Sequence, residues 1–186
     1  MNDIHMGNNS QISLWSKFSC LGLIPFILAL DQLTKLLIVD SMHRNQSIDV
    51  IGSFFRLTYI HNPGAAFGLS LGGPEIHTIV SLIALGVLVY LFWTLPVETK
   101  LLRFAVTMVL GGAIGNIVDR VRLGEVVDFF DFGIGNQWRW PIFNVADSFV
   151  TVGIIILAIG YSRQKEPQTE QPIDSNFIDE KKNIES

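Results

Sequence analysis

The stretches GGAIGNIVDR, VVDFFDF and FNVAD, at residues 111–120, 126–132 and 143–147, organise this chain. The first ends one long apolar segment and the last begins another, yet both carry Asp and Asn side chains. An ionisable side chain near hydrocarbon costs free energy, and proteins retain one there mainly where a function requires it. These stretches therefore mark a candidate functional site.

The segments around these stretches are apolar enough to cross a membrane. Of the 186 residues, 49% are hydrophobic and 16% are charged, which is too apolar for an ordinary soluble domain. A helix needs roughly 20 apolar residues to cross a bilayer. We therefore expect an all-α integral membrane protein with one membrane domain over residues 18–161. Its four transmembrane helices are predicted at residues 18–39, 76–95, 101–118 and 141–161.

The two ends of the chain have a different composition from this domain. Residues 1–17 and 162–186 are polar and lack an apolar period, so we expect a short disordered lead and a disordered tail. The net charge is -4, and the sequence has no basic patch with interleaved aromatic residues. Nucleic-acid binding is therefore not predicted. Cys20 is the only cysteine, so it forms no internal disulfide, and we interpret it as inert.

One segment between the predicted spans has a period of two. Phe55, Leu57 and Tyr59 alternate with Arg56 and Thr58, which predicts a small strand or hairpin within residues 48–60. NPGAAFG follows at residues 62–68 and suits a tight backbone passing close to another element. We expect residues 121–140 to form a second loop.

Helical spacing predicts two contacts inside the membrane domain. Asp31 and Lys35 are four residues apart and can pair on one helix face. The pair is either structural, with Lys35 extending toward the interface, or it shapes the site. Gly111 and Gly115 have the spacing that lets membrane helices approach closely.

Four antiparallel spans place all the unusual polar residues on one side of the membrane. A transporter would instead carry polar residues through the whole depth of the membrane, often in two repeated halves. A site at one interface fits this chain better. The residues on that side are Asp31, Lys35, Asn62, Asn116, Asp119, Arg120, Asp128, Asp131, Asn144 and Asp147.

Carboxylates are the side chains in this set that can carry out chemistry. Cys20 is distant in sequence, and the four histidines lie outside the cluster, so no nucleophile with its base is predicted. Two carboxyl groups held close together share one proton. One can then take a proton from water while the other donates one to a carbonyl, which hydrolyses a peptide bond. The sequence alone leaves open which aspartates meet.

Five motifs, in their order, resemble those of the lipoprotein signal peptidases. They are DQLTK at residues 31–35, NPGAAFG, GGAIGNIVDR, VVDFFDF and FNVAD. The resemblance implies an aspartyl endopeptidase of the bacterial cytoplasmic (inner) membrane, with cytoplasmic termini and a small extracytoplasmic β cradle. Such an enzyme removes the signal peptide before a diacylglyceryl-modified cysteine and is blocked by globomycin.

The resemblance also implies roles for individual residues. Asp128 and Asp147 match the catalytic pair, while Asp119 remains our second choice and Asp131 has no assigned role. The resemblance implies no metal and no cofactor, and the partners are lipid-modified prolipoproteins and membrane lipid; we expect a monomer. A proton-coupled transporter and a non-catalytic membrane binding protein are the rival functions. The supporting residues are Asp31, Lys35, Asn62, Gly64, Asn116, Asp119, Arg120 and Asn144.

Overall fold

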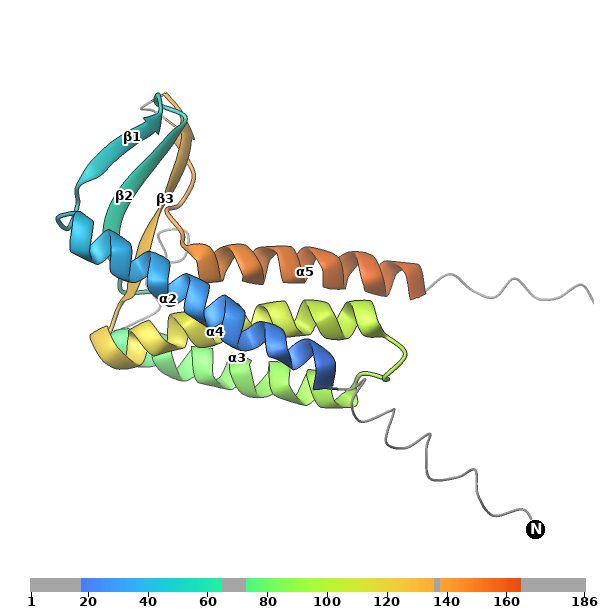
Figure 1. Ribbon diagram of the computed structural model, residues 1–186. Helices are drawn as coiled ribbons and strands as arrows, with labels where there is room; N and C mark the ends of the chain where they lie inside the picture. The colour runs from blue at the N-terminus through green and yellow to red at the C-terminus, as the bar shows by residue number, and fades with distance from the viewer. Residues whose placement is uncertain (1–17, 65–72, 136–137, 165–186) are drawn as a thin grey trace, which may run out of the picture.

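A computed structural model describes residues 18–64, 73–135 and 138–164. The lead predicted at residues 1–17 and nearly all of the predicted tail lie outside these ranges. Four long helices run side by side, and a small sheet projects from one end of the bundle (Figure 1). The first helix begins and the last helix ends at the opposite end of the bundle (Figure 1).

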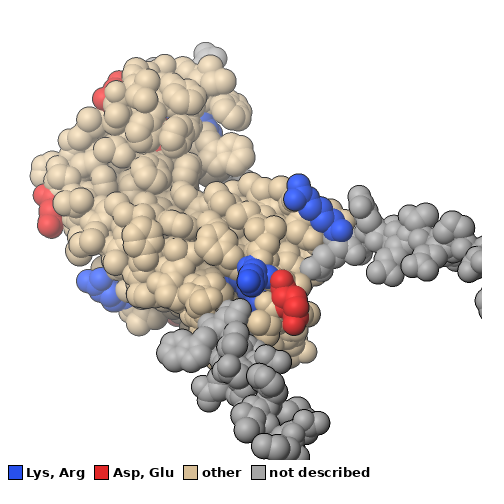
Figure 2. Space-filling view, turned by 45° about the vertical axis from the view of Figure 1, so that its right-hand side comes forward, with Lys and Arg blue, Asp and Glu red and all other residues tan. Residues whose placement is uncertain are grey.

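Within the described residues, four helical segments have the length and composition of membrane spans, which confirms the number predicted. On the face that Figure 2 shows, charged side chains are few and lie toward the ends of the elements. Such an uncharged middle suits contact with lipid. The elements are the 3-10 turn η1 (Ser19–Gly22), which leads into α2 (Leu23–Ser41), then α3 (Pro74–Thr94), α4 (Lys100–Leu123) and α5 (Val145–Gln164).

Helix α4 is the centre of the bundle and packs against α2, α3 and α5. Its glycines permit these contacts, as the small-residue spacing predicted. A Cβ atom on Gly115 would lie 2.6 Å from Oδ2 of Asp31 in α2, and one on Gly112 would lie 2.3 Å from the carbonyl oxygen of Ala146 in α5. Helices α2 and α5 therefore approach α4 closely where the polar residues lie.

Arg103 is buried at the α3–α4 turn, with 2% of its surface exposed. Its guanidinium donates hydrogen bonds to the carbonyls of Phe92 and Leu95, and it lies 4.2 Å from the centre of the Phe92 ring. It thereby satisfies carbonyl groups that the end of α3 leaves without helical partners.

The sheet has four antiparallel strands in the order β1-β2-β3-β4. The hairpin predicted from the alternating segment is present, but the all-α class is imprecise, because a sheet accompanies the helices and β3 forms where a loop was expected. VVDFFDF lacks a polar-apolar alternation since residues on both of its faces are buried. The strands are β1 (Ser47–Ile51), β2 (Phe55–Asn62), β3 (Val126–Ile134) and β4 (Trp138–Arg139).

A hydrophobic cluster joins the sheet to the ends of the helices. Tyr59, Val127 and Phe129 from the sheet pack with Ile38 of α2 and Val145 of α5. Asp128 lies between two of these buried residues of β3, so the cluster determines where its carboxylate stands. The sheet is thus a fixed support at one end of the bundle.

Candidate active site

The first turn of α5 positions two polar side chains of FNVAD. The side-chain oxygen of Asn144 accepts a hydrogen bond from the backbone nitrogen of Asp147 at 2.9 Å, and Oδ2 of Asp147 accepts one from the backbone nitrogen of Asn144 at 3.2 Å. This reciprocal arrangement resembles a capping box. It holds the Asp147 carboxylate at a helix N-terminus, where the helix dipole favours negative charge.

Amide groups surround the carboxylate of Asp128. Its Oδ1 accepts a hydrogen bond from Nδ2 of Asn144 at 2.7 Å, and its Oδ2 accepts one from Nδ2 of Asn62 at 2.9 Å. Asn116 of α4 donates to Oδ1 of Asp147 at 2.7 Å. Asn144 therefore links both carboxylates, which come from β3 and α5 and lie 19 positions apart in sequence.

The pKa of Asp128 is raised from its ordinary value of 3.8 to about 7. Burial is the main cause, because it disfavours the anion, and the charge of nearby Asp147 adds to the effect. The hydrogen bonds from Asn62 and Asn144, and the charge of Lys35, act in the opposite direction. This carboxyl group can therefore gain or lose a proton near neutral pH.

Both carboxylates line one cleft of about 900 Å³. Arg120, near the end of α4, and Asn62 and Gly64, at the end of β2, contribute to its wall. Gly64 has a φ of +113°, and a Cβ there would lie 2.3 Å from the ring of His77. Only glycine suits this position, because both the backbone conformation and the space exclude a side chain.

A separate ionic cluster lies beside the cleft, and it joins α2 to α4. Lys35 pairs with Asp31 at 2.9 Å, as the helical spacing predicted, and also with Asp119 at 2.7 Å. The extension of Lys35 to the interface is wrong, because only 3% of the residue is exposed. Gln32 donates hydrogen bonds to both carboxylates.

This ionic cluster also holds the elements that carry the site. Oδ1 of Asp31 accepts a hydrogen bond from the backbone nitrogen of Ala146 in α5, and Oδ2 of Asp119 accepts one from that of Val127 in β3. Lys35 donates to the side-chain oxygen of Asn116 at 3.0 Å. The cluster thus fixes α5 and β3 on either side of the cleft.

Asp131 stands apart from both groups. Its carboxylate accepts hydrogen bonds from Thr58 at 2.7 Å and from Arg139 at 2.5 Å. Arg139 also donates to the carbonyl of Ser53. Asp131 therefore connects β2, β3 and β4, a structural role that the sequence did not reveal because it depends on strand pairing.

His61 lines the cleft, so the expectation that all histidines lie outside the cluster is wrong. Its Nε2 lies 2.7 Å from the hydroxyl of Tyr59, and its Nδ1 lies 3.0 Å from Oε2 of Glu125. In the sequence, only the position of His61 next to Asn62 could have indicated that it lies at the site. Within the described ranges, no three His, Cys, Asp or Glu side chains are grouped to hold a metal ion.

Comparisons with known proteins identify the family of this chain. Residues 23–163 match the family model described as signal peptidase (SPase) II. The chain is 45% identical over 131 residues to a lipoprotein signal peptidase of Moorella thermoacetica, covering 70% of this chain and 84% of the relative. It is 40% identical over 146 residues to one of Syntrophus aciditrophicus, covering 75% and 90%.

The fold also has a counterpart among solved structures. A structure described as a bacterial membrane enzyme superposes with a TM-score of 0.70 at 34% sequence identity, covering 84% of this chain and 94% of the other. The similarity therefore extends over the helices and the sheet together.

Proposed function

The chain belongs to the signal peptidase II family and is an aspartic peptidase that removes signal peptides from prolipoproteins, and we propose that Asp128 and Asp147 are its catalytic pair. One observation carries this assignment: the two carboxylates line the same cleft and are linked by one asparagine. Such a pair suits a peptidase, and membership of this family argues against a transporter and a passive binding protein.

The two carboxylates have different roles in peptide hydrolysis, one as the general acid and the other as the general base. Asp128, with its pKa near 7, holds the shared proton in the resting enzyme and donates it to the oxygen of the scissile carbonyl. Asp147 is the anion and takes a proton from the attacking water. Protonation of the leaving nitrogen and loss of the proton from the tetrahedral intermediate then return the pair to its first state.

The remaining residues of the cleft support this pair. Asn62, Asn116 and Asn144 hold the carboxylate oxygens in fixed directions. Arg120 places a positive charge in the same wall. Asp119 is a weaker choice for a catalytic group, because it pairs with Lys35 at 2.7 Å and is not among the residues that line the cleft.

The site faces the extracytoplasmic side of the bacterial inner membrane, where a signal peptide emerges after export. The termini then lie in the cytoplasm, the substrate is a diacylglyceryl-modified precursor, the enzyme works as a monomer, and globomycin inhibits it. With Cys20 replaced, a cysteine at Ser53 should react with an impermeant thiol reagent in intact cells, and one at Glu98 should not. The reverse labelling pattern would overturn this orientation.

Cleavage of defined precursors tests the function directly. Purified enzyme should cut a lipid-modified prolipoprotein just before its modified cysteine and leave the unmodified precursor intact. The variant Asp147→Asn is the matched control, because it removes the base while keeping the size of the side chain. Cleavage by this variant at the normal rate would exclude Asp147 from the chemistry.

A further inference from the structure

A second hollow, of about 350 Å³, lies on the sheet beside the active-site cleft. Its volume is within the range of ligand pockets in proteins. Four of its side chains are more than half exposed: Phe54 at 56%, Ile134 at 73%, Trp138 at 58% and Trp140 at 51%. The complete lining is Phe54, Phe132, Gly133, Ile134, Trp138, Trp140 and Phe143.

This apolar pocket adjoins the cleft. Trp140 and Phe143 belong to the walls of both spaces. Phe143 also contacts β3, since its carbonyl oxygen accepts hydrogen bonds from the backbone nitrogens of Phe129 and Phe130. Trp140 and Phe143 therefore connect the cleft that holds Asp128 to the pocket.

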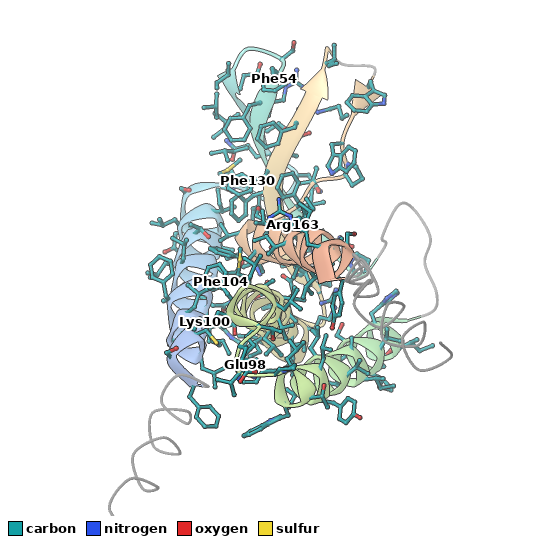
Figure 3. All side chains as sticks on the ribbon, turned by 90° about the vertical axis from the view of Figure 1, so that its right-hand side faces the viewer. Phe54, Glu98, Lys100, Phe104, Phe130 and Arg163 are labelled. Atoms are coloured by element: carbon teal, nitrogen blue, oxygen red, sulfur yellow. The ribbon has the colours of Figure 1, made fainter. Side chains whose placement is uncertain are left out.

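Phe130 lies in the sheet near the helices, and Phe54 lies toward its far end (Figure 3). The walls are also held in place by ring contacts. Phe132 stacks on Phe55 with ring centres 4.6 Å apart and on Phe143 at 5.8 Å, so the pocket exists before any ligand arrives.

We propose that this pocket binds an acyl chain of the lipid-modified precursor while the peptide bond lies between Asp128 and Asp147. The inference rests on the proposed function. A pocket lined by apolar side chains suits hydrocarbon, and its shared walls with the cleft place that hydrocarbon next to the modified cysteine. A pocket for ordinary bilayer lipid would not need to share walls with the active-site cleft.

The dependence of cleavage kinetics on acyl-chain length tests whether the pocket binds this chain. Two precursors would be compared that differ only in their acyl groups, palmitoyl in one and butyryl in the other. Ile134→Trp should fill the pocket without disturbing the core, because Ile134 is largely exposed. The control is Ile51→Trp, a similarly exposed position at 61% in β1 that does not line the pocket.

Ile134→Trp should raise KM for the palmitoyl precursor roughly tenfold, the size of effect typical of a changed apolar contact. Its kcat, and both constants for the butyryl precursor, should stay near those of the parent enzyme. Equal losses with the two precursors, the same loss in Ile51→Trp, or no loss at all would overturn the inference. If the parent enzyme cleaves neither precursor, the proposed function itself fails.

A direct measure of proximity complements the kinetics. Bromine atoms on the palmitoyl chain should quench tryptophan fluorescence when the precursor binds to the inactive Asp147→Asn enzyme. In that background Trp138→Phe should reduce the quenching and leave the affinity for the peptide part unchanged, and adding Trp140→Phe should remove most of the remaining quenching. Quenching that persists without Trp138 and Trp140 would place the chain elsewhere and overturn the inference.

Discussion

Two groups of carboxylates lie next to each other in this protein and have opposite surroundings. Asp31 and Asp119 contact the ammonium group of Lys35, whereas Asp128 and Asp147 accept hydrogen bonds from amides. Asn116 joins the two groups, since it accepts a hydrogen bond from Lys35 and donates one to Asp147. The first group therefore holds helices together through charge pairs, while the second group lines the cleft.

The largest expected effect is a loss of catalytic activity, and it distinguishes the two groups of carboxylates. Asp128→Asn or Asp147→Asn should each lower kcat by on the order of 10⁴-fold, and the double variant should be little worse, because residues that act as one unit are strongly non-additive. Thermal unfolding in detergent should remain cooperative. A single-turnover assay with a lipid-modified precursor gives the rate. Near-normal turnover in Asp128→Asn, with a folded but inactive Asp119→Asn, would move the catalytic role to Asp119.

Substitutions in the ionic cluster should instead lower the free energy of unfolding. Asp119→Asn leaves Lys35 with fewer negative partners in a buried place and should cost up to about 3–5 kcal/mol, the range for breaking a buried pair. Turnover per folded molecule should remain measurable.

The control for this experiment is Asp49→Asn, which removes an exposed partner of Arg56 and should cost about 1 kcal/mol or less. Melting temperatures measured with kcat on the same samples separate the two effects. A variant of Asp119 that melts normally and lacks all activity would contradict the structural role.

The pH dependence of stability sharpens the comparison further. Since burial raises the pKa of folded Asp128 to about 7, the folded state keeps a proton that the unfolded state releases above 3.8. The stability that this proton contributes is complete at low pH and is lost as pH rises toward 7. The melting temperature of Asp128→Asn, relative to the parent, should therefore rise between pH 4 and 7 and then level off. A constant difference would contradict the raised pKa.

The smallest effects concern the neutral side chains of each group. Asn62→Ala removes a donor to Asp128 and should lower turnover with little change in melting temperature. Gln32→Ala removes donors to Asp31 and Asp119 and should lower stability by about 1 kcal/mol with little change in turnover. Reversed responses would show that the two groups do not have separate roles.

Local patterns in the sequence predicted much of this structure. The apolar runs predict four helices because hydrocarbon tolerates backbone only when its polar groups are bonded internally. The spacing of Asp31 and Lys35 predicted their ion pair, and the spacing of Gly111 and Gly115 predicted close helix packing. Each of these features depends on residues that are close together in the sequence.

Long-range pairing produced the features that the local patterns missed. Strand β3 forms because residues 126–132 pair with a strand more than sixty positions earlier, and VVDFFDF shows no period of its own since both faces are covered. Arg103 and Asp131 likewise have partners that only the folded chain brings near.

The sequence by itself determined which residue types could carry the chemistry and that they lie on one side of a four-helix membrane protein. Only the tertiary structure decided which aspartates meet, because Asp119, Asp128 and Asp147 are equally polar and equally close to apolar segments in the sequence. Strand pairing and the cap of α5 give Asp128 and Asp147 amide partners in one cleft, whereas helix packing gives Asp119 a lysine. These partners come from elements that are distant in the sequence, so local patterns could not identify them.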